Sequence, residues 1–191
     1  MKIVGVMGSP RTNGNSDTIA RQILLEAEKL GADTETFVLN NLSYKGCQAC
    51  MGCKIGSDKC VIRDDLAAVL AAVASADVLI MASPIYFGQV TGQLKTFIDR
   101  TYSFLTPDYL KDPMHASRLA PGKKCVFILT QGNPDETMFA DVAGNFERFL
   151  TWYGYDVSVI RGLGMRDKED AANDKNLLAK ASETARQLVA G

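Results

Sequence analysis

Several signatures that would define a function are missing from this chain of 191 residues. It holds one histidine, His115, and Ser9 lies in no G-x-S-x-G elbow, so a serine-hydrolase triad is not indicated. The net charge is −1, which gives no electrostatic reason to expect nucleic acid or an anionic membrane as a partner. No apolar run is long enough to span a bilayer, and the first apolar residues lead directly into a glycine-rich turn rather than a signal peptide. A cytoplasmic protein with no nucleic-acid or membrane partner is therefore expected.

What the chain does contain is an alternation of apolar strands and amphipathic helices. Hydrophobic residues make up 47% and charged residues 23%, which is typical of a globular protein, and a single domain is expected over residues 1–191. Apolar patterning predicts strands near 2–7, 36–39, 77–82, 125–130 and 157–160, and helices near 19–30, 66–73, 94–105, 139–153 and 168–189. This order predicts an α/β fold, a doubly wound five-stranded parallel sheet with helices on both faces. Ligands of such sheets bind beyond the carboxyl ends of the strands, so loops 8–16, 84–92 and 131–135 should meet at one rim.

The first of these loops, residues 8–16 (GSPRTNGNS), has the chemistry of a phosphate site. It opens a helix, whose N-terminus offers free N–H groups and the positive end of a dipole. Short polar side chains and the charged fork of Arg11 add further donors. The triphosphate loop G-x-x-x-x-G-K-[ST] and the dinucleotide fingerprint G-x-G-x-x-G are both missing here, which favours a monophosphate. The same composition also fits a plain helix cap beside a flexible turn.

The loop after the third expected strand, residues 83–88 (SPIYFG), is apolar and aromatic where water would favour polar side chains. Such a cluster suits packing on a flat conjugated ring, and glycine allows a close backbone approach. The alternative is that Tyr86 and Phe87 pack a subunit interface, since an exposed aromatic patch often marks association.

Together, GSPRTNGNS and SPIYFGQVTGQLKTFIDR resemble the NAD(P)H-dependent FMN reductase branch of the flavodoxin-like superfamily, over most of the chain from Lys2 to about Gly164. The resemblance implies strand order 2-1-3-4-5 with FMN at the rim. It implies a phosphate site formed by Ser9, Arg11, Asn15, Ser16 and Asp17. It implies an isoalloxazine site formed by Pro84, Ile85, Tyr86, Phe87 and Gly88. Residues 130–133 (TQGN) match the third loop of the family less closely.

Four of the five cysteines lie in one loop, residues 44–63, at Cys47, Cys50, Cys53 and Cys60. Disulfides are rare in the cytosol, so this cluster points to metal or redox chemistry. The C-x₂-C-x₂-C spacing lets three thiolates converge, and Cys60 can return to complete a four-ligand shell, as in ferredoxin-type clusters. Structural zinc, free thiols and air-formed disulfides are alternatives. Cys125 lies inside an apolar strand and is interpreted as a small buried hydrophobe.

The cysteine spacing resembles the compact motif of the iron–sulfur flavoproteins, which belong to the same superfamily. That resemblance implies one [4Fe–4S] cluster per chain, close to the flavin of a neighbouring subunit, and a homodimer or homotetramer that receives electrons from ferredoxin. The leading hypothesis is an FMN-dependent oxidoreductase that couples a one-electron carrier to a two-electron acceptor. A cluster-free NAD(P)H-dependent FMN oxidoreductase of the quinone or flavin reductase type is the first alternative, and a flavodoxin-like electron carrier is the second.

Overall fold

The sheet is the element that positions everything else in this computed structural model, which describes residues 1–190. Its strands are β1 (Lys2–Met7), β2 (Asp33–Val38), β3 (Val78–Tyr86), β4 (Gln89–Val90), β5 (Lys124–Thr130) and β6 (Asp156–Gly162). All neighbours pair in parallel except β4, which folds back antiparallel on β3. The order is β2-β1-β3-β5-β6, which is the expected 2-1-3-4-5 once the short β4 is left out of the count.

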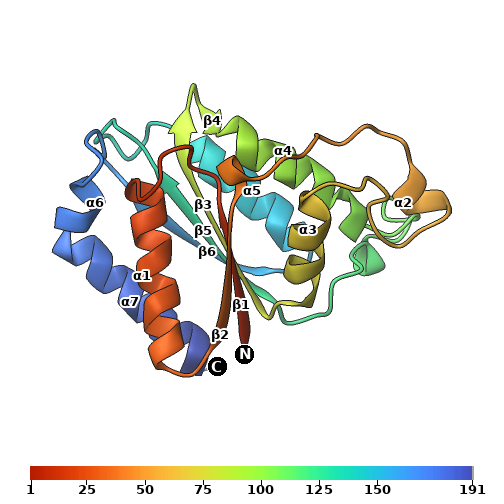
Figure 1. Cartoon of the computed structure of the whole chain (residues 1–191), viewed down its shortest axis with the longest axis horizontal. Coiled ribbons are helices and arrows are strands. Elements are labelled where there is room, and N and C mark those ends of the chain that lie inside the picture. The colour runs from red at the N-terminus through yellow and green to blue at the C-terminus, as the bar shows by residue number, and fades with distance from the viewer. Residues whose placement is uncertain (191) are drawn as a thin grey trace.

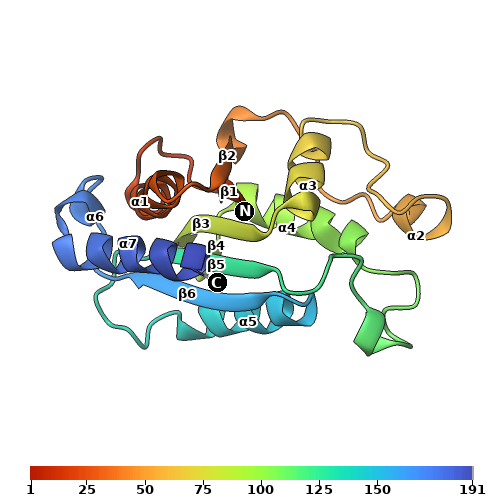
Figure 2. The same cartoon turned by 90° about the horizontal axis from the view of Figure 1, so that it is seen from below.

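Helices cover both faces of this sheet (Figures 1 and 2). The α-helices are α1 (Asn15–Lys29), α2 (Gly52–Ile55), α3 (Leu66–Ser75), α4 (Gly92–Arg100), α5 (Ala140–Trp152), α6 (Asp170–Asn173) and α7 (Lys175–Ala190). Short 3-10 turns are η1 (Leu39–Asn41), η2 (Thr101–Phe104) and η3 (Pro113–His115). Helices α1, α6 and α7 pack on one face, and α3, α4 and α5 pack on the other. The expected α/β class is therefore confirmed.

Alternation along the strands explains why both faces are buried. In β1, Ile3 and Met7 pack under α1, while Val4 and Val6 pack under the helices of the other face. The same division holds in β5, where Phe127 faces α5. Successive side chains of a strand point to opposite faces, so a strand covered on both sides must be apolar throughout.

The main departure from the expected elements is the β3–β4 hairpin, because residues 84–92 were expected to form a loop. Strand β3 continues to Tyr86, and Ile85 pairs with Val90. The two residues of the turn, Phe87 and Gly88, have φ values of 49° and 74°. Two central residues with positive φ are what a tight type I′ hairpin turn requires.

The C-terminal helix also differs from the expected continuous span of 168–189. It is divided into α6 and α7 at Asp174. The Asp174 carboxylate accepts the Leu177 N–H at 3.0 Å and so caps α7. Among the described residues, none of the helices combines the length and the apolar character that crossing a bilayer would need.

Candidate functional site

The loop between β1 and α1 forms one wall of a cavity at the carboxyl rim of the sheet. Gly8 donates its N–H to the Ala82 carbonyl at 2.8 Å, and a Cβ added at Gly8 would lie 2.7 Å from the Leu94 Cβ. Glycine is therefore required at this crossing of β1, β3 and α4. Ser9 then accepts the Arg11 N–H at 3.1 Å, which turns the chain back toward the start of α1.

The cavity has a volume of about 330 Å³ and brings together loops that are distant in sequence. This volume lies in the range of small-ligand sites. Its lining consists of Ser9, Arg11, Gly14, Asn15, Ser16, Pro84, Ile85, Tyr86, Thr130, Gly132, Met165, Arg166 and Lys168. The expected phosphate loop and the expected ring loop therefore do meet at one rim, together with the third loop at Thr130 and Gly132.

The first turn of α1 has hydrogen-bond donors without protein partners, as anion-binding sites do. Ser16 is buried, and its hydroxyl finds no hydrogen-bond partner among the described residues. The first N–H groups of a helix also lack intrahelical partners. A phosphate at this end of the cavity would satisfy both, and it would be favoured by the helix dipole.

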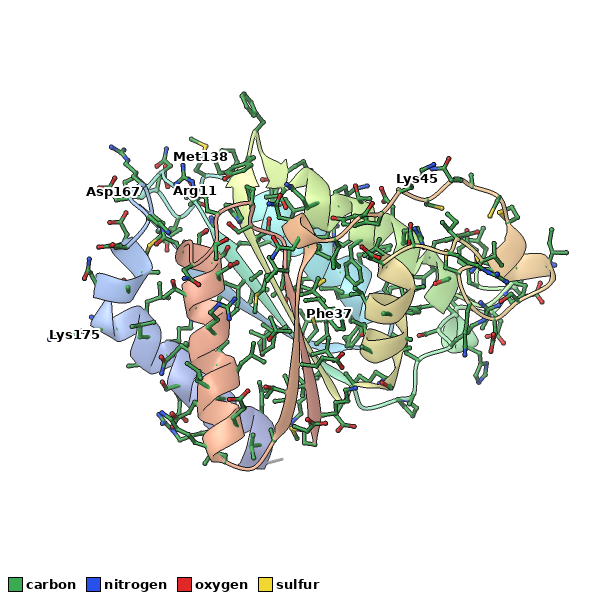
Figure 3. All side chains as sticks on the ribbon, in the orientation of Figure 1. Arg11, Phe37, Lys45, Met138, Asp167 and Lys175 are labelled. Atoms are coloured by element: carbon green, nitrogen blue, oxygen red, sulfur yellow. The ribbon has the colours of Figure 1, made fainter. Side chains whose placement is uncertain are left out.

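Two cations of the cavity, Arg166 and Lys168, were not expected from the sequence. Both follow β6 and lie in the segment that leads to α6. Arg166 is fixed by its Nε, which donates to the Gly132 carbonyl at 3.0 Å. Figure 3 shows Arg11 at the same end of the molecule as Asp167. The rule that loops after parallel strands converge could have found this segment, since it follows the last strand.

Asn15 joins this segment to the phosphate loop. Its amide donates to the Asp167 carbonyl at 2.7 Å and accepts the Ala171 N–H at 2.9 Å. Both functional ends of the side chain are thus engaged by the protein. Asn15 therefore contributes to the cavity by holding Arg166 and Lys168 beside Arg11.

Three of the expected FMN-binding residues do not line the cavity. Asp17 is fully buried within α1, where desolvation, opposed by the charge of Arg21, raises its pKa to about 6. Phe87 is fully exposed at the hairpin tip, and Gly88 lies beside it. Tyr86 lines the cavity and is half-exposed.

The four clustered cysteines line a second cavity, formed by the loop around α2. Cys47 and Cys50 are exposed, Cys60 is half-buried, and Cys53 is buried. Ala49 and Met51 adopt left-handed φ values of 49° and 57°, which wind the loop tightly between its first three cysteines. Such left-handed turns expose successive N–H groups and form the concave nests found around iron–sulfur centres.

The α2 loop is held against the body of the protein by two cations. Arg118 donates from Nη1 to the carbonyls of Cys53, Asp58 and Ser103 at 2.9, 3.1 and 2.8 Å. Lys54 donates from Nζ to the carbonyls of Tyr102 and Leu105, both at 2.6 Å. The loop is therefore fixed to η2 by the protein's own side chains.

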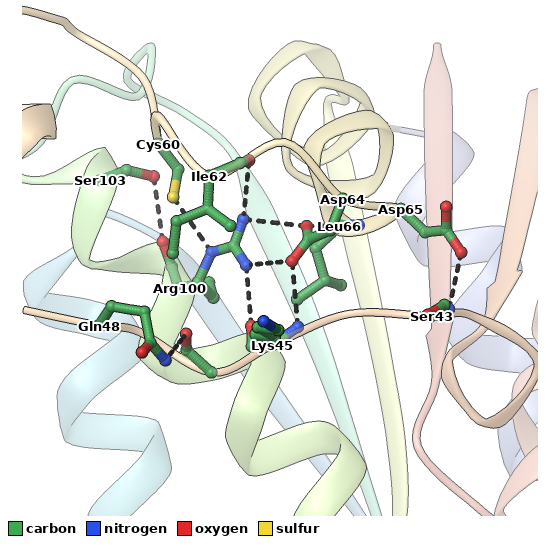
Figure 4. A network of polar contacts seen from close by, with 11 residues as sticks. Ser43, Lys45, Gln48, Cys60, Ile62, Asp64, Asp65, Leu66, Arg100 and Ser103 are labelled. Atoms are coloured by element: carbon green, nitrogen blue, oxygen red, sulfur yellow. Dashed lines mark hydrogen bonds and ion pairs between the residues drawn. The ribbon is translucent and has the colours of Figure 1, made fainter.

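A third cation, Arg100, closes the base of the cysteine loop (Figure 4). Its side chain is fully buried and pairs with Asp64 at 2.8 Å. Asp64 also accepts the Leu66 N–H at 3.2 Å, at the start of α3. The neighbouring Asp65 accepts the Ser43 N–H at 2.7 Å, so this acidic pair also anchors the chain leading into the loop.

The four thiols share one cavity, but they are not arranged as a site for a single metal ion. Within residues 1–190, no three His, Cys, Asp or Glu side chains converge closely enough to hold one metal ion. A tetrahedral zinc site, with Zn–S bonds of about 2.3 Å, needs its four sulfurs within roughly 4 Å of each other. Four thiolates are also the ligand type and number that a [4Fe–4S] cluster requires, with one thiolate on each iron.

Comparison with known proteins agrees with the fold. The order of the parallel sheet and the helices on both of its faces define a flavodoxin-like fold. Residues 1–143 match the model of the NADPH-dependent FMN reductase family, and the chain belongs to that family. It is accordingly an FMN-dependent oxidoreductase.

Relatives in sequence are named iron-sulfur flavoproteins. The chain is 32% identical over 189 residues to one from Archaeoglobus fulgidus, a match that covers 98% of this chain and 79% of the relative. Over 101 residues it is 39% identical to one from Methanocaldococcus jannaschii and 38% identical to one from Methanosarcina thermophila. These two matches span 53% of this chain and about half (52%) of each relative.

Solved structures with the same fold are more distant in sequence. An NAD(P)H:quinone oxidoreductase from Methanothermobacter marburgensis superposes with a TM-score of 0.76 at 16% identity, covering 98% of this chain and 96% of the other. An FMN-dependent NADH-azoreductase from Bacillus anthracis, in complex with FMN, gives 0.74 at 16% identity, covering 99% and 100%. At such identity these likenesses concern the fold alone.

Proposed function

We propose that this protein is an iron–sulfur flavoprotein, which passes electrons between a one-electron carrier such as ferredoxin and a two-electron acceptor. The observation that carries the proposal is the convergence of Cys47, Cys50, Cys53 and Cys60 on one cavity. Four spaced cysteines in sequence could belong to unrelated positions, but here they share a cavity whose loop is fixed by buried and half-buried cations. The relationship to iron-sulfur flavoproteins supports the same function.

In the proposed FMN site, the N-terminus of α1 holds the phosphate, together with Ser9, Arg11 and Ser16. Asn15 positions the neighbouring segment through its two bonds, and Asp17 is buried within α1 rather than facing the cavity. Arg166 and Lys168 add positive charge at the same place, which suits a phosphate dianion. Pro84, Ile85 and Tyr86 form the apolar wall for the ring, and Phe87 and Gly88 form the adjoining turn. The protein thereby binds the flavin, orients it and excludes water from one of its faces.

In the proposed cluster site, the four thiolates would ligate the irons, and Arg100, Lys54 and Arg118 would offset the negative charge that thiolates bring. When bound, FMN supplies two-electron chemistry and a [4Fe–4S] cluster supplies one-electron chemistry. No acid–base triad is needed for such a protein, because its residues serve to bind and tune the redox groups.

The two proposed sites lie toward opposite ends of the long axis of the chain, with α1 and α2 on different sides in both views (Figures 1 and 2). Apolar side chains are exposed near each site, Phe87 beside the rim cavity and Ile55, 84% exposed, on the cysteine loop. We therefore propose a homodimer or homotetramer in which the cysteine loop of one copy approaches the rim cavity of another. Ile55→Ser and Phe87→Ser variants should sediment as smaller species, and an unchanged mass for both would contradict this arrangement.

The cluster is tested by iron and sulfide analysis, with visible and electron paramagnetic spectra, on protein prepared and reconstituted without oxygen. We expect about four irons per chain for a single cubane cluster. The Cys50→Ser variant should lose the signal, whereas Cys125→Ser should keep it, because Cys125 is buried in β5 away from the loop. An iron-free wild-type protein would contradict the proposal, and bound zinc would assign the loop to a structural role.

A cluster-free NAD(P)H-dependent FMN oxidoreductase is the second candidate. The observation in its favour is that Cys47 and Cys50 are exposed and that no three potential ligands converge on one point among the described residues. Stopped-flow measurement decides: rapid anaerobic bleaching of bound FMN by NADH or NADPH, in protein without iron, would support it. An absence of bleaching by either nucleotide would count against it.

A further inference from the structure

The guanidinium of Arg100 uses all of its hydrogen-bonding capacity on the cysteine loop and its flank. Nε donates to the Cys60 Sγ at 3.1 Å. Nη1 donates to the Lys45 carbonyl and to Asp64, both at 2.8 Å. Nη2 donates to the Ile62 carbonyl at 3.3 Å and to Asp64 at 3.1 Å. These five bonds correspond to the five N–H donors that an arginine side chain possesses.

The acceptors of Arg100 belong to both arms of the loop. Lys45 precedes Cys47, whereas Cys60 and Ile62 stand on the returning arm. The arms also approach each other at Gly52, where an added Cβ would lie 2.7 Å from the Val61 Cγ2. One side chain from α4 therefore joins the start and the end of the segment that carries all four thiols (Figure 4).

Burial strengthens these hydrogen bonds. The Arg100 side chain is 0% exposed, so water does not compete for its donors. Taking a guanidinium out of water is costly unless it is paired and fully hydrogen-bonded. Asp64 supplies the counter-charge, and the remaining donors are consumed by two carbonyls and one sulfur. The planar guanidinium can reach all of these acceptors only when the two arms of the loop lie side by side, as they do in this structure.

We propose that Arg100 is the positioning residue of the cysteine site: it holds Cys60 at the cavity and, by donating to that sulfur, favours the reduced state of a cluster bound there. This inference rests on the proposed function and assigns the residue that sets the potential. Reduction adds one negative charge to a cluster. Hydrogen bonds to cluster sulfurs and nearby positive charge stabilise that added charge and raise the reduction potential.

Arg100→Lys and Arg118→Lys form a matched pair of variants. Both keep the positive charge and lose the guanidinium fork. Both residues hold the loop, but only Arg100 donates to a sulfur. In a redox titration of reconstituted protein, followed by electron paramagnetic resonance, Arg100→Lys should be about tenfold less reduced at a given potential, a shift of about 59 mV for one electron. Arg118→Lys should titrate as the wild type does.

A second measurement covers the case in which the cluster does not assemble. Hydrogen exchange of residues 45–62 in iron-free protein should be at least tenfold faster in Arg100→Lys than in the wild type, because the arms are no longer joined.

A third variant, Asp64→Asn, keeps Arg100 and removes its counter-charge. In the redox titration, the reduction potential of a cluster in this variant should move in the opposite, positive direction.

The outcomes distinguish the proposed function from the role proposed for Arg100. Wild-type protein that binds no iron contradicts the proposed function, while the exchange experiment still tests Arg100 as the residue that closes the loop. Wild-type protein with a cluster and an Arg100→Lys variant with unchanged potential and unchanged exchange would overturn the inference. Equal potential shifts in Arg100→Lys and Arg118→Lys would also overturn it, because the bond to Cys60 would then have no separate effect.

Discussion

Replacing Thr91 by valine should destabilise the protein through the loss of one buried hydroxyl. Thr91 caps α4 and is 1% exposed. Its Oγ1 donates to the Gly8 carbonyl at 2.7 Å and accepts the Leu94 N–H at 3.3 Å. Valine keeps the shape of the side chain, so the change removes these two bonds together with the long bond that Ser83 Oγ donates to Thr91 Oγ1 at 3.5 Å. An unsatisfied buried carbonyl costs about 1–3 kcal/mol, and loss of a helix cap costs about 1 kcal/mol.

The two contributions give an expected loss of about 2–4 kcal/mol in the free energy of unfolding. With a urea m-value of about 2 kcal/mol per molar, the unfolding midpoint should fall by roughly 1–2 M. Far-ultraviolet circular dichroism in urea measures this, and Thr91→Ser, which keeps the hydroxyl, should lose much less. FMN affinity should also weaken, because Gly8 leads directly into the phosphate loop. If Thr91→Val and Thr91→Ser unfolded at the same urea concentration, the reasoning would be refuted.

Three other predictions follow from single contacts or charges. Burial raises the pKa of Asp17 from 3.8 to about 6, so the stability that Asp17 contributes below pH 3.8 is lost as the pH rises to 6. This contribution amounts to about 3 kcal/mol in the free energy of unfolding. Asp17→Asn should remove it, so the difference between wild type and variant should change by that amount between pH 3.8 and 6, and a constant difference would contradict the buried-carboxyl account. Arg166→Met and Lys168→Met should weaken FMN binding in fluorescence titrations yet leave riboflavin binding unchanged, since riboflavin lacks the phosphate; equal losses for both ligands would contradict a phosphate role. Asp174→Ala should cost about 1 kcal/mol by uncapping α7, and an unchanged thermal midpoint would show that this cap is not needed.

Sequence patterns were most informative where local chemistry repeats along the chain. The buried strand 125–130 was recognisable because a strand covered on both faces is apolar at every position, and β5 spans Lys124–Thr130. The turn at residues 8–14 was recognisable as the start of a helix because glycine and short polar residues stand between a strand and a helix; its role in binding phosphate stays a prediction. The hairpin at Phe87 was not recognisable, since a phenylalanine with positive φ has no local sequence signal.

Contacts between segments that are distant in the chain could not be predicted from the sequence. Asn15 was expected to face a phosphate, but its bonds to Asp167 and Ala171 join residues more than 150 positions apart. Arg166 and Lys168 carry no motif and belong to the rim cavity only because β6 ends beside β5. Arg100 likewise resembles any cation at the end of an amphipathic helix until its neighbours are known.

The sequence by itself determined the layered α/β class, the place of the glycine-rich loop before α1 and the four clustered thiols, because each of these depends on residues that are close together in the chain. The tertiary structure decided which loops share the rim cavity, how the cysteine loop is closed, and that a buried arginine from α4 contacts Cys60. Those features depend on which elements become neighbours when the sheet is assembled. Packing of the two apolar faces selects these neighbours, and no short segment encodes them.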